Sequence, residues 1–391
     1  MSDQFQEQLA ALRARSLHRK LREIGTAQGP EVEIVGRHLL NFSSNDYLGL
    51  AADPILRQAA IAAIEEFGVG AGASRLISGT QSPHVVLESA LARWKGTPAA
   101  ICFSSGYAAA VGTLPALASK QDVVILDKLC HASLIDGARL SGAILRVFPH
   151  NHLGKLESHL EWARREYPEA RIVVVTESVF SMDGDRAPLR ELVELKKRFQ
   201  AFLLLDEAHA IGVLGPHGRG LAAELGLESE IDAQMGTLSK SLGASGGYIC
   251  GSRGLIDWLI NRARSFIFST APPPALAATA TAAVRFLASD EGEARRKTLW
   301  RRIVQLRKLL PMTKNEFGQP AAAIIPWIVG DEERALDLAR ALQQEGFFVP
   351  AIRYPTVAKG AARLRITVSA VHSALQIASL GDAIRRLGGR G

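Results

Sequence analysis

Short apolar runs alternate with helical segments along the first two thirds of this 391-residue chain, and this alternation most restricts its fold. The runs expected to form strands are residues 99–103, 123–126, 144–147, 172–176, 202–205 and 247–250. The helices expected between them are residues 83–95, 108–117, 153–166 and 189–199. Nearly continuous apolar strands separated by helices are typical of a mostly parallel sheet that is covered on both faces. The sequence therefore predicts an α/β fold.

The two ends of the chain have different patterns. Apolar positions at helical spacing predict a helix over about 4–23, followed by a strand pair at 31–35 and 38–41. A long helical stretch from about 271 to 311 precedes further elements at 324–329, 332–344, 363–368 and from 372. We expect an N-terminal helix and strand segment (1–44), a large α/β domain (45–285) and a small α+β domain (286–391).

Charge and composition exclude several classes of function. The formal net charge is +7, but the basic residues are spread along the chain, and no zinc-finger or aromatic RNA-binding motif is present. This pattern predicts attraction for small anionic molecules and no nucleic-acid partner. The three cysteines lie far apart without a CxxC pair, and the histidines form no HExxH motif, so neither a disulfide framework nor a metal site is expected.

The sequence shows neither a secretory signal nor a membrane span. The residues after Met1 lack a charged segment followed by an apolar one. No apolar run approaches the ~18 residues that a spanning helix needs. We expect a cytoplasmic protein with reduced thiols and no membrane partner.

Three expected strands end in a carboxylate, namely Asp127, Glu177 and Asp206. In open α/β sheets ligands bind at the carboxyl ends of strands. Taken singly, each carboxylate is better interpreted as a strand end that reaches solvent or caps a helix. Asp206 differs because it follows a very apolar run and precedes His209. A buried carboxylate needs a cation to stay charged, and a protonated pyridine nitrogen would supply one.

Lys240 lies 34 positions after Asp206 (240 − 206) in a loop rich in glycine, serine and threonine. A lysine amine becomes a nucleophile toward carbonyl groups when desolvation or nearby cations lower its pKa. A lone lysine in a polar loop is ordinarily solvated. Asp206 could pair with a pyridine nitrogen, and Lys240 could form a Schiff base. Together they indicate a cofactor that is bound through a lysine and accepts electrons.

A candidate phosphate site follows the first strand of the alternating region. The segment from Ser104 to Tyr107 lies between that strand and a helix, where free N–H groups and the helix dipole favour an anion. An ordinary strand–helix turn with a serine cap explains the same residues equally well. The glycine-rich run 68–72 follows a helical segment rather than a strand, which disfavours a dinucleotide fingerprint.

Two motifs suggest other enzyme classes. Residues 243–247 match G-x-S-x-G, which would make Ser245 a hydrolase nucleophile, but this serine precedes a strand instead of following one. Lys240-Ser241 resembles the end of a P-loop, but Ser239 stands where glycine is required. A serine hydrolase remains a distant alternative, and an NTPase is disfavoured.

Several ordered segments resemble the α-oxoamine synthases, which belong to the fold-type I pyridoxal-phosphate enzymes. They are NFSSNDYLG (41–49), SVFSMDGD (178–185), DEAH (206–209), AIRYPTV (351–357) and ARLRIT (362–367). The resemblance implies an aspartate aminotransferase-like α/β fold, with a mostly parallel seven-stranded sheet in a large domain and a smaller α+β C-terminal domain. It also implies condensation of an amino acid with an acyl thioester, with loss of carbon dioxide.

The resemblance assigns roles around the cofactor. Lys240 would hold pyridoxal 5'-phosphate covalently, Asp206 would pair with the ring nitrogen, and His131 would stack on the ring. His209 and Ser181 would lie near the ring hydroxyl. The residues expected at the phosphate or the adjoining ring edge are Gly106, Tyr107 and Thr237, with Ser269 and Thr270 reaching the phosphate of a neighbouring subunit. A homodimer with shared active sites is therefore expected.

The same resemblance assigns substrate contacts. Asn45 and Arg365 would hold the amino-acid carboxylate, which suits the planar fork of guanidinium. Arg22, Arg353 and Thr356 are expected near the acyl substrate, and His131 would also contact substrate. The motifs favour the family member that joins L-alanine to a pimeloyl thioester, carried by coenzyme A or a carrier protein. Members that use glycine remain the alternative, since Tyr354 replaces a common proline.

Four of these residues have simpler interpretations when the resemblance is set aside. His131 would be a helix N-terminal residue in the core, and Arg22 a solvated helix arginine. Arg353 would form a surface ion pair. His209 would cap Asp206 within one turn, so that even this interpretation places it beside the carboxylate.

Overall fold

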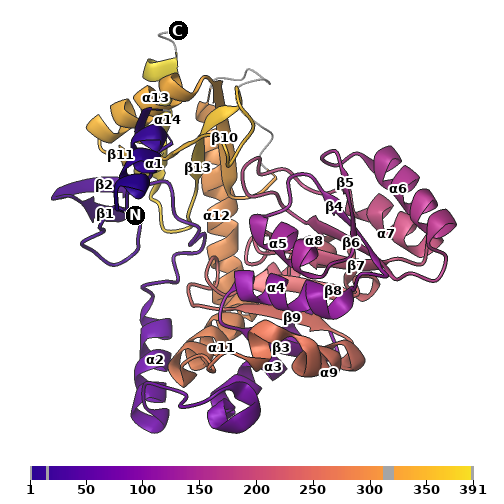
Figure 1. Cartoon of the computed structure of the whole chain (residues 1–391). Helices are drawn as coiled ribbons and strands as arrows, with labels where there is room; N and C mark the ends of the chain where they lie inside the picture. Colours follow the sequence, from indigo (N-terminus) through magenta and orange to yellow (C-terminus); the bar gives the residue numbers. More distant parts are fainter. Residues whose placement is uncertain (1, 15–16, 311–320, 389–391) are drawn as a thin grey trace.

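A seven-stranded sheet forms the centre of the larger part of the molecule (Figure 1). The computed structural model describes residues 2–14, 17–310 and 321–388. The strand order is β3 (Ala99–Phe103), β9 (Gly247–Gly251), β8 (Ala233–Thr237), β7 (Phe202–Asp206), β6 (Ile172–Glu177), β4 (Val123–Asp127) and β5 (Ile144–Phe148). β9 runs in the opposite direction to the other six strands. The predicted mostly parallel sheet is confirmed.

The central strands are buried on both faces, as their valine-rich and leucine-rich sequences predict. Val173 and Val175 pack with one core cluster, whereas Ile172 and Val174 pack with the other, because successive side chains of a strand point to opposite faces. Each face is covered by helices. The helices of one face are α4 (Gly106–Leu117), α5 (Ala132–Leu140), α9 (Arg253–Arg262) and α10 (Arg264–Ile267), and those of the other include α3 (Ser82–Lys95), α6 (Leu153–Glu166) and α7 (Leu189–Arg198).

The N-terminal strands join the C-terminal part of the chain. β1 (Glu31–Ile34) pairs with β2 (Arg37–Asn41), and β2 pairs in parallel with β11 (Phe347–Phe348). A second three-stranded sheet contains β10 (Ile324–Gly330), β13 (Ala362–Thr367) and β12 (Ala351–Ile352). These sheets, with α13 (Glu332–Gln344) and α14 (Ala374–Gly388), form the upper lobe in Figure 1. The domain boundaries at 44/45 and 285/286 remain a prediction.

The N-terminal helix is shorter than the sequence predicts. α1 covers Ser2–Ala14, and residues 17–23 are not helical. The apolar stripe that suggested a longer helix is not buried in this chain, since Phe5 is 65% and Leu21 is 103% exposed. Ile24 instead forms an antiparallel β-bridge with Ile34 of β1, so the backbone at Ile24 is extended rather than helical.

The long helical stretch expected at 271–311 is divided. α11 (Pro274–Ala288) ends at Ser289, whose hydroxyl accepts a hydrogen bond from Gly292 N–H and so caps α12 (Asp290–Leu309). A Cβ at Gly292 would lie 2.1 Å from Phe286 O, so this tight junction needs glycine. The predicted end near residue 311 lies outside the described residues. In Figure 1, α12 runs from the upper lobe down toward α11.

The sequence analysis missed β8. Its sequence, AQMGT, contains a glycine and little β-branched character, so it has weak strand propensity. A Cβ at Gly236 would lie 2.5 Å from Tyr248 Oη on β9, which explains the glycine by close packing between strands.

The remaining elements are two helices and three short helical turns. They are α2 (Pro54–Phe67), a π-helical turn at Arg75–Gly79, α8 (Leu221–Leu225) and 3₁₀ turns at Pro216–Gly218 and Glu228–Glu230. α2 packs against α11. Among the described residues, no helix is long and apolar enough to cross a membrane.

Candidate active site

A cavity of about 250 Å³ lies at the carboxyl ends of the central strands. Its walls come from the turn into α4, the start of α5, the ends of β6, β7 and β8, and the loop after β8. The lining residues are Ser105, Gly106, Tyr107, His131, Ser133, Glu177, Asp206, Ala208, His209, Met235, Thr237, Ser239 and Lys240. The parallel strand order thus brings together residues that are more than a hundred positions apart.

Two buried carboxylates lie side by side on the cavity wall. Glu177 and Asp206 are register partners on β6 and β7, and their exposed fractions are 3% and 6%. Burial raises the pKa of Asp206, while Lys240 and the N–H of Ala208 oppose the rise. Burial and the neighbouring charge of Asp206 raise the pKa of Glu177 to about 8. The pair therefore favours a positively charged group in the cavity.

Lys240 faces this carboxylate pair. Its Nζ lies 2.8 Å from His209 Nε2. Burial, opposed by Asp206 and Glu177 and assisted by Arg365, lowers the pKa of Lys240 to about 8. A lysine with such a pKa is partly neutral near pH 7 to 8, which is the state that attacks a carbonyl group or accepts a proton.

A continuous hydrogen-bond chain runs from Lys240 to Arg365. His209 Nδ1 lies 2.7 Å from Tyr47 Oη, which donates to Asn45 Oδ1 at 3.2 Å. Arg365 Nη2 also donates to Asn45 Oδ1, at 3.1 Å. Burial and the positive charge of Lys240 hold the pKa of His209 far below its usual range, so this imidazole is neutral. The chain connects a sheet of the C-terminal lobe to the cavity of the large sheet.

The expected phosphate end of the cavity is a helix N-terminus. The Ser105 hydroxyl accepts a hydrogen bond from Ala108 N–H, while the first N–H groups of any helix, here those of Gly106 and Tyr107, have no partner inside the helix. Gly247 carries no side chain here, and a Cβ would lie 2.6 Å from Gly106 N. The close approach of β9 to this turn therefore keeps the turn beside Thr237 at the cavity.

His131 begins α5 beside the carboxylates. Its backbone N–H donates to Glu177 Oε1, and its Nδ1 lies 2.8 Å from Ser133 Oγ. Burial lowers the pKa of this histidine, with Asp206 opposing the effect and Lys240 adding to it. A neutral ring at the cavity wall suits contact with a planar ligand.

Ser181 lies next to Arg365, in the loop between β6 and α7. Its backbone oxygen accepts a hydrogen bond of 2.6 Å from Arg365 Nε. Ser181 and Asn45 are connected to the cavity through Arg365 and Tyr47, but they do not line it.

The residues expected near the acyl substrate lie away from the cavity. Arg22 is exposed, and its guanidinium lies 5.4 Å from the centre of the Phe348 ring. Thr356 is exposed and accepts a hydrogen bond from Arg19. Arg353 is half-buried on the same loop as Thr356.

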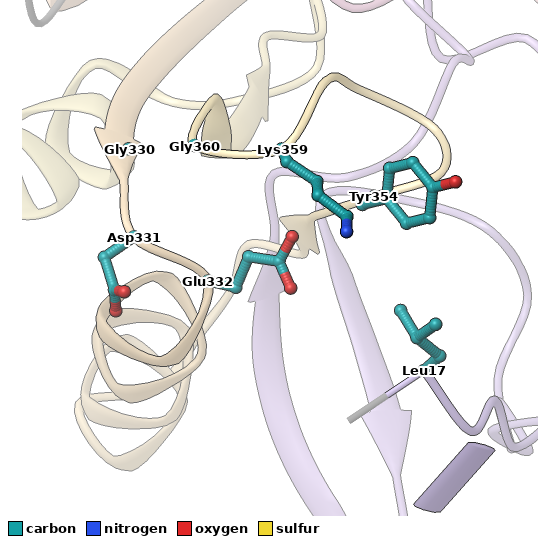
Figure 2. A pocket seen from close by; sticks show the side chains of 7 residues that line it. All are labelled: Leu17, Gly330, Asp331, Glu332, Tyr354, Lys359 and Gly360. Atoms are coloured by element: carbon teal, nitrogen blue, oxygen red, sulfur yellow. The ribbon is translucent and has the colours of Figure 1, made fainter. Parts of the chain in front are cut away.

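A second cavity, of about 310 Å³, borders that loop (Figure 2). Figure 2 shows Lys359 between Glu332 and Tyr354, with Leu17 of the N-terminal segment opposite. The Lys359 ammonium lies 5.4 Å from the centre of the Tyr354 ring. Because its walls carry charges of both signs and no residue of the carboxylate pair, this cavity is not the site of the cofactor chemistry.

Ser269 and Thr270 do not line the cavity of their own chain. Thr270 pairs with Ser74 in an isolated bridge. Ser245, the nucleophile of the hydrolase alternative, is exposed and precedes β9, so the required strand–nucleophile–helix order is absent there.

Glu177 is the main site residue that the sequence analysis did not single out. In the sequence it is a strand end like Asp127, whereas Asp206 is also followed by His209. The signal that would have found it is register, since two parallel strands that both end in a carboxylate place the two side chains together. Tyr47 was part of a motif, but its contact with His209 joins residues 162 positions apart and has no local signal.

Comparison with known proteins first defines the class. The chain matches the aminotransferase class I and II family over residues 37–384. A solved variant of serine palmitoyltransferase from S. paucimobilis, with a bound aldimine of pyridoxal phosphate and myriocin, superposes with a TM-score of 0.91 at 33% identity, covering 99% of this chain and 97% of that one. Fold and site are thus those of an enzyme whose cofactor is pyridoxal phosphate.

Two further relatives narrow the class. The 8-amino-7-oxononanoate synthase of Anaeromyxobacter dehalogenans is 48% identical over 370 residues, which cover 95% of this chain and 92% of that protein. The solved 8-amino-7-oxononanoate synthase of Francisella tularensis has a TM-score of 0.75 at 26% identity, covering 90% of this chain and 98% of that one. The chain belongs to the 8-amino-7-oxononanoate synthases, which are pyridoxal-phosphate-dependent acyltransferases.

The cavity fits this cofactor. Asp206 and Glu177 suit a protonated ring nitrogen, the Lys240 amine suits an aldehyde, and the start of α4 suits a phosphate. The cavity volume is close to the ~300 Å³ at which small-molecule pockets begin. Among the described residues, no group of three or more histidine, cysteine, aspartate or glutamate side chains is placed to hold a metal ion.

Proposed function

We propose that this chain condenses L-alanine with a pimeloyl thioester to give 8-amino-7-oxononanoate, carbon dioxide and a free thiol, the step of biotin biosynthesis after which its relatives are named. A new bond joins the alanine Cα to the acyl carbonyl carbon, the thiol leaves, and the alanine carboxylate departs as carbon dioxide. The observation that carries the proposal is the Lys240 amine, which lies 2.8 Å from neutral His209 and faces a buried carboxylate pair.

Lys240 is the proton carrier of this reaction. Pyridoxal phosphate supplies an electron-accepting ring that stabilises negative charge at the amino-acid Cα. The Lys240 amine takes the proton from Cα before the condensation and returns one to the same carbon afterwards. Proton transfer by a positioned side chain is worth ~10²–10⁴-fold in rate. Asp206 would support this chemistry by pairing its carboxylate with the protonated ring nitrogen.

Arg365 and Asn45 hold the amino-acid carboxylate. The Arg365 guanidinium is buried, and two of its nitrogens are already fixed by Ser181 O and Asn45 Oδ1. A guanidinium fixed in this way presents its remaining N–H groups to a carboxylate with little loss of side-chain entropy.

Arg22, Arg353 and Thr356 form the acyl-thioester side of the site. The supporting observation is that Arg353 and Thr356 lie on one loop, beside the N-terminal segment that carries Arg22. Thr356 accepts a hydrogen bond from Arg19 of that segment, and Arg22 itself lies over the Phe348 ring. The cations of this region suit the phosphates of coenzyme A and the phosphopantetheine of a carrier protein alike.

A homodimer with shared active sites completes the proposal. Ser269 and Thr270 lie outside their own cavity, and the adjacent Phe268 is 70% exposed. Ile77 is 81% exposed on the turn that contacts α10. Exposed apolar side chains gathered near an active site are typical of a subunit interface.

The three cysteines are buried and free, which agrees with a place in the cytoplasm.

The test of substrate is a thiol-release assay of the holoenzyme that crosses alanine, glycine and serine with pimeloyl-, acetyl- and succinyl-coenzyme A. Alanine with pimeloyl-coenzyme A should give the highest kcat/KM. Faster reaction of glycine with a short acyl donor would assign the chain instead to the activity of 2-amino-3-ketobutyrate–coenzyme A ligase or 5-aminolevulinate synthase. A parallel assay with pimeloyl-carrier protein identifies the natural carrier.

A further inference from the structure

The loop between β6 and α7, residues 178–186, connects the carboxylate of the cofactor site to the arginine of the amino-acid subsite. At its base, Ser178 N–H donates to Asp206 O at 2.8 Å, and Val179 and Arg186 form a bridge that closes the loop. We call residues 178–186 the linking loop. Its base therefore moves with the strand end that carries Asp206.

The tip of the linking loop contacts β13. Arg365 Nε donates to Ser181 O at 2.6 Å, and Arg363 Nη1 donates to Asp183 Oδ1 at 2.6 Å. Gly184 has φ +68°, and a Cβ there would lie 2.5 Å from Ile324 O. The loop thus fits tightly against the C-terminal sheet, and its position fixes that of the Arg365 guanidinium.

His150 connects the linking loop to the large sheet. Its Nδ1 lies 3.1 Å from Asp127 Oδ1 at the end of β4, and its Nε2 lies 2.8 Å from Asp185 Oδ2 in the loop. The ring also packs edge-on against Phe180, at 4.3 Å between ring centres. Because each ring nitrogen faces a carboxylate, the imidazole is held as a cation that joins the two.

The hydrogen bonding of the Asp185 carboxylate depends on His150 and the residue after it. Its Oδ2 accepts hydrogen bonds from His150 and from Asn151 Nδ2, at 3.0 Å for the latter. Its Oδ1 is buried and has no hydrogen-bond partner within the described part of the chain. Asn151 also donates to Arg186 O at 3.2 Å. The side chains of His150 and Asn151 therefore attach the linking loop to the connection between β5 and α6.

We infer that His150 is a positioning residue for amino-acid binding: by joining Asp127 to Asp185, it holds the linking loop so that Ser181 O orients Arg365 toward the substrate carboxylate. His150 itself lies outside the cavity and touches neither cofactor nor substrate. The inference deepens the proposed function and rests on it, because it concerns the carboxylate subsite of the same reaction.

The experiment measures amino-acid binding to the holoenzyme from the change in cofactor absorbance, together with the steady-state constants. His150→Ala and Asp185→Asn should each raise the dissociation constant for alanine about tenfold, since small misplacement of a positioning group is costly. The KM for the acyl thioester and the cofactor content should stay unchanged. His150→Lys, which keeps a cation between the two carboxylates, should recover part of the affinity.

Lys196→Met is the matched control. It removes a well-formed ion pair of the large domain, with Asp232 at 2.7 Å, far along the chain from the linking loop. It should lower the melting temperature and leave alanine binding unchanged. The inference is overturned if the His150 and Asp185 variants lose stability like this control but bind alanine normally, or if both substrates weaken equally.

Failure of the proposed function is recognised separately. If the wild-type holoenzyme binds glycine or serine in place of alanine, the substrate assignment is wrong. The same variants are then measured with that amino acid, whose carboxylate still requires Arg365.

Discussion

The hydroxyl of Tyr47 lies 2.7 Å from Nδ1 of His209, and both side chains are buried. Since Tyr47 Oη donates to Asn45 Oδ1, it accepts the Nδ1 proton of His209, and His209 Nε2 is left as the acceptor that faces Lys240. Tyr47 thereby sets the tautomer of the imidazole beside the reactive amine. This contact is a consequence of the fold and has no counterpart in local sequence.

Tyr47→Phe should therefore slow the reaction while preserving the fold. Loss of the hydroxyl leaves His209 Nδ1 without its buried partner, which costs ~1–3 kcal/mol. We expect kcat to fall about tenfold, because the second tautomer directs a proton at Lys240. Tyr248→Phe is the control, since Tyr248 Oη is equally buried but has no hydrogen-bond partner among the described residues. Equal losses in the two variants would contradict the tautomer role.

Lys240→Ala should abolish condensation. Without the amine no positioned base reaches the amino-acid Cα, and the loss should be at least ~10²–10⁴-fold in kcat. Asp206, Gly106 and Thr237 remain, so the variant should still bind pyridoxal phosphate non-covalently. Borohydride treatment followed by mass spectrometry of the chain should attach the cofactor to the wild type only. Thiol release by the variant at a wild-type rate would disprove the role of Lys240.

Glu177→Gln should lower the pKa of Lys240 below about 8. The negative charge of Glu177 is one of the two that oppose the effect of burial on this amine, and the substitution removes it. The cofactor-free variant should react with an amine-specific reagent at Lys240 with a pH midpoint below that of the wild type. Glu66→Gln, on the exposed face of α2, serves as control and should leave the midpoint unchanged. A higher midpoint in Glu177→Gln would reverse the assigned sign.

The fold was largely predictable because the strands that build it are local apolar runs. The predicted strand at 99–103 coincides with β3, and the other predicted strands of the large sheet each end one residue before the observed strand does. Lys240, Asp206 and Gly106 do meet in one cavity, as the sequence predicts for strand ends and their loops. The hydrogen-bond chain through Tyr47 and the role of Glu177 depend on strand register and on packing between lobes, which the local pattern does not carry.

Lys95→Met should destabilise the protein strongly although Lys95 lies outside the cavity. Lys95 Nζ lies 2.5 Å from Glu207 Oε2 and also donates to Arg219 O, and the two charged side chains are 1% and 0% exposed. Removal of one partner of a buried ion pair costs ~3–5 kcal/mol, because the other charge stays buried. Lys197→Met breaks an exposed pair with Glu230 and should cost less than ~1 kcal/mol. Urea unfolding of the three proteins compares these values.

The His150 contact should make stability decrease at alkaline pH. Asp127 and Asp185 raise the pKa of His150 from 6.5 to about 10, against the opposing effect of burial. Because the pKa of His150 is higher in the folded state than in the unfolded state, protonation of His150 stabilises the folded protein. This stabilisation is complete below pH 6.5 and is lost as the pH rises toward 10.

Between those limits the free energy of unfolding should fall by ~1–3 kcal/mol more in the wild type than in His150→Gln, after allowance for solvent screening of the partly exposed ring. The ionisable groups of the cofactor site, Lys240 and Glu177, are unchanged in both proteins, so their effects cancel in the comparison. Urea unfolding of both holoenzymes at intervals across this range measures the difference. Parallel stability curves would show that His150 is not held as a cation, and the joining of Asp127 to Asp185 would then rest on neutral hydrogen bonds alone.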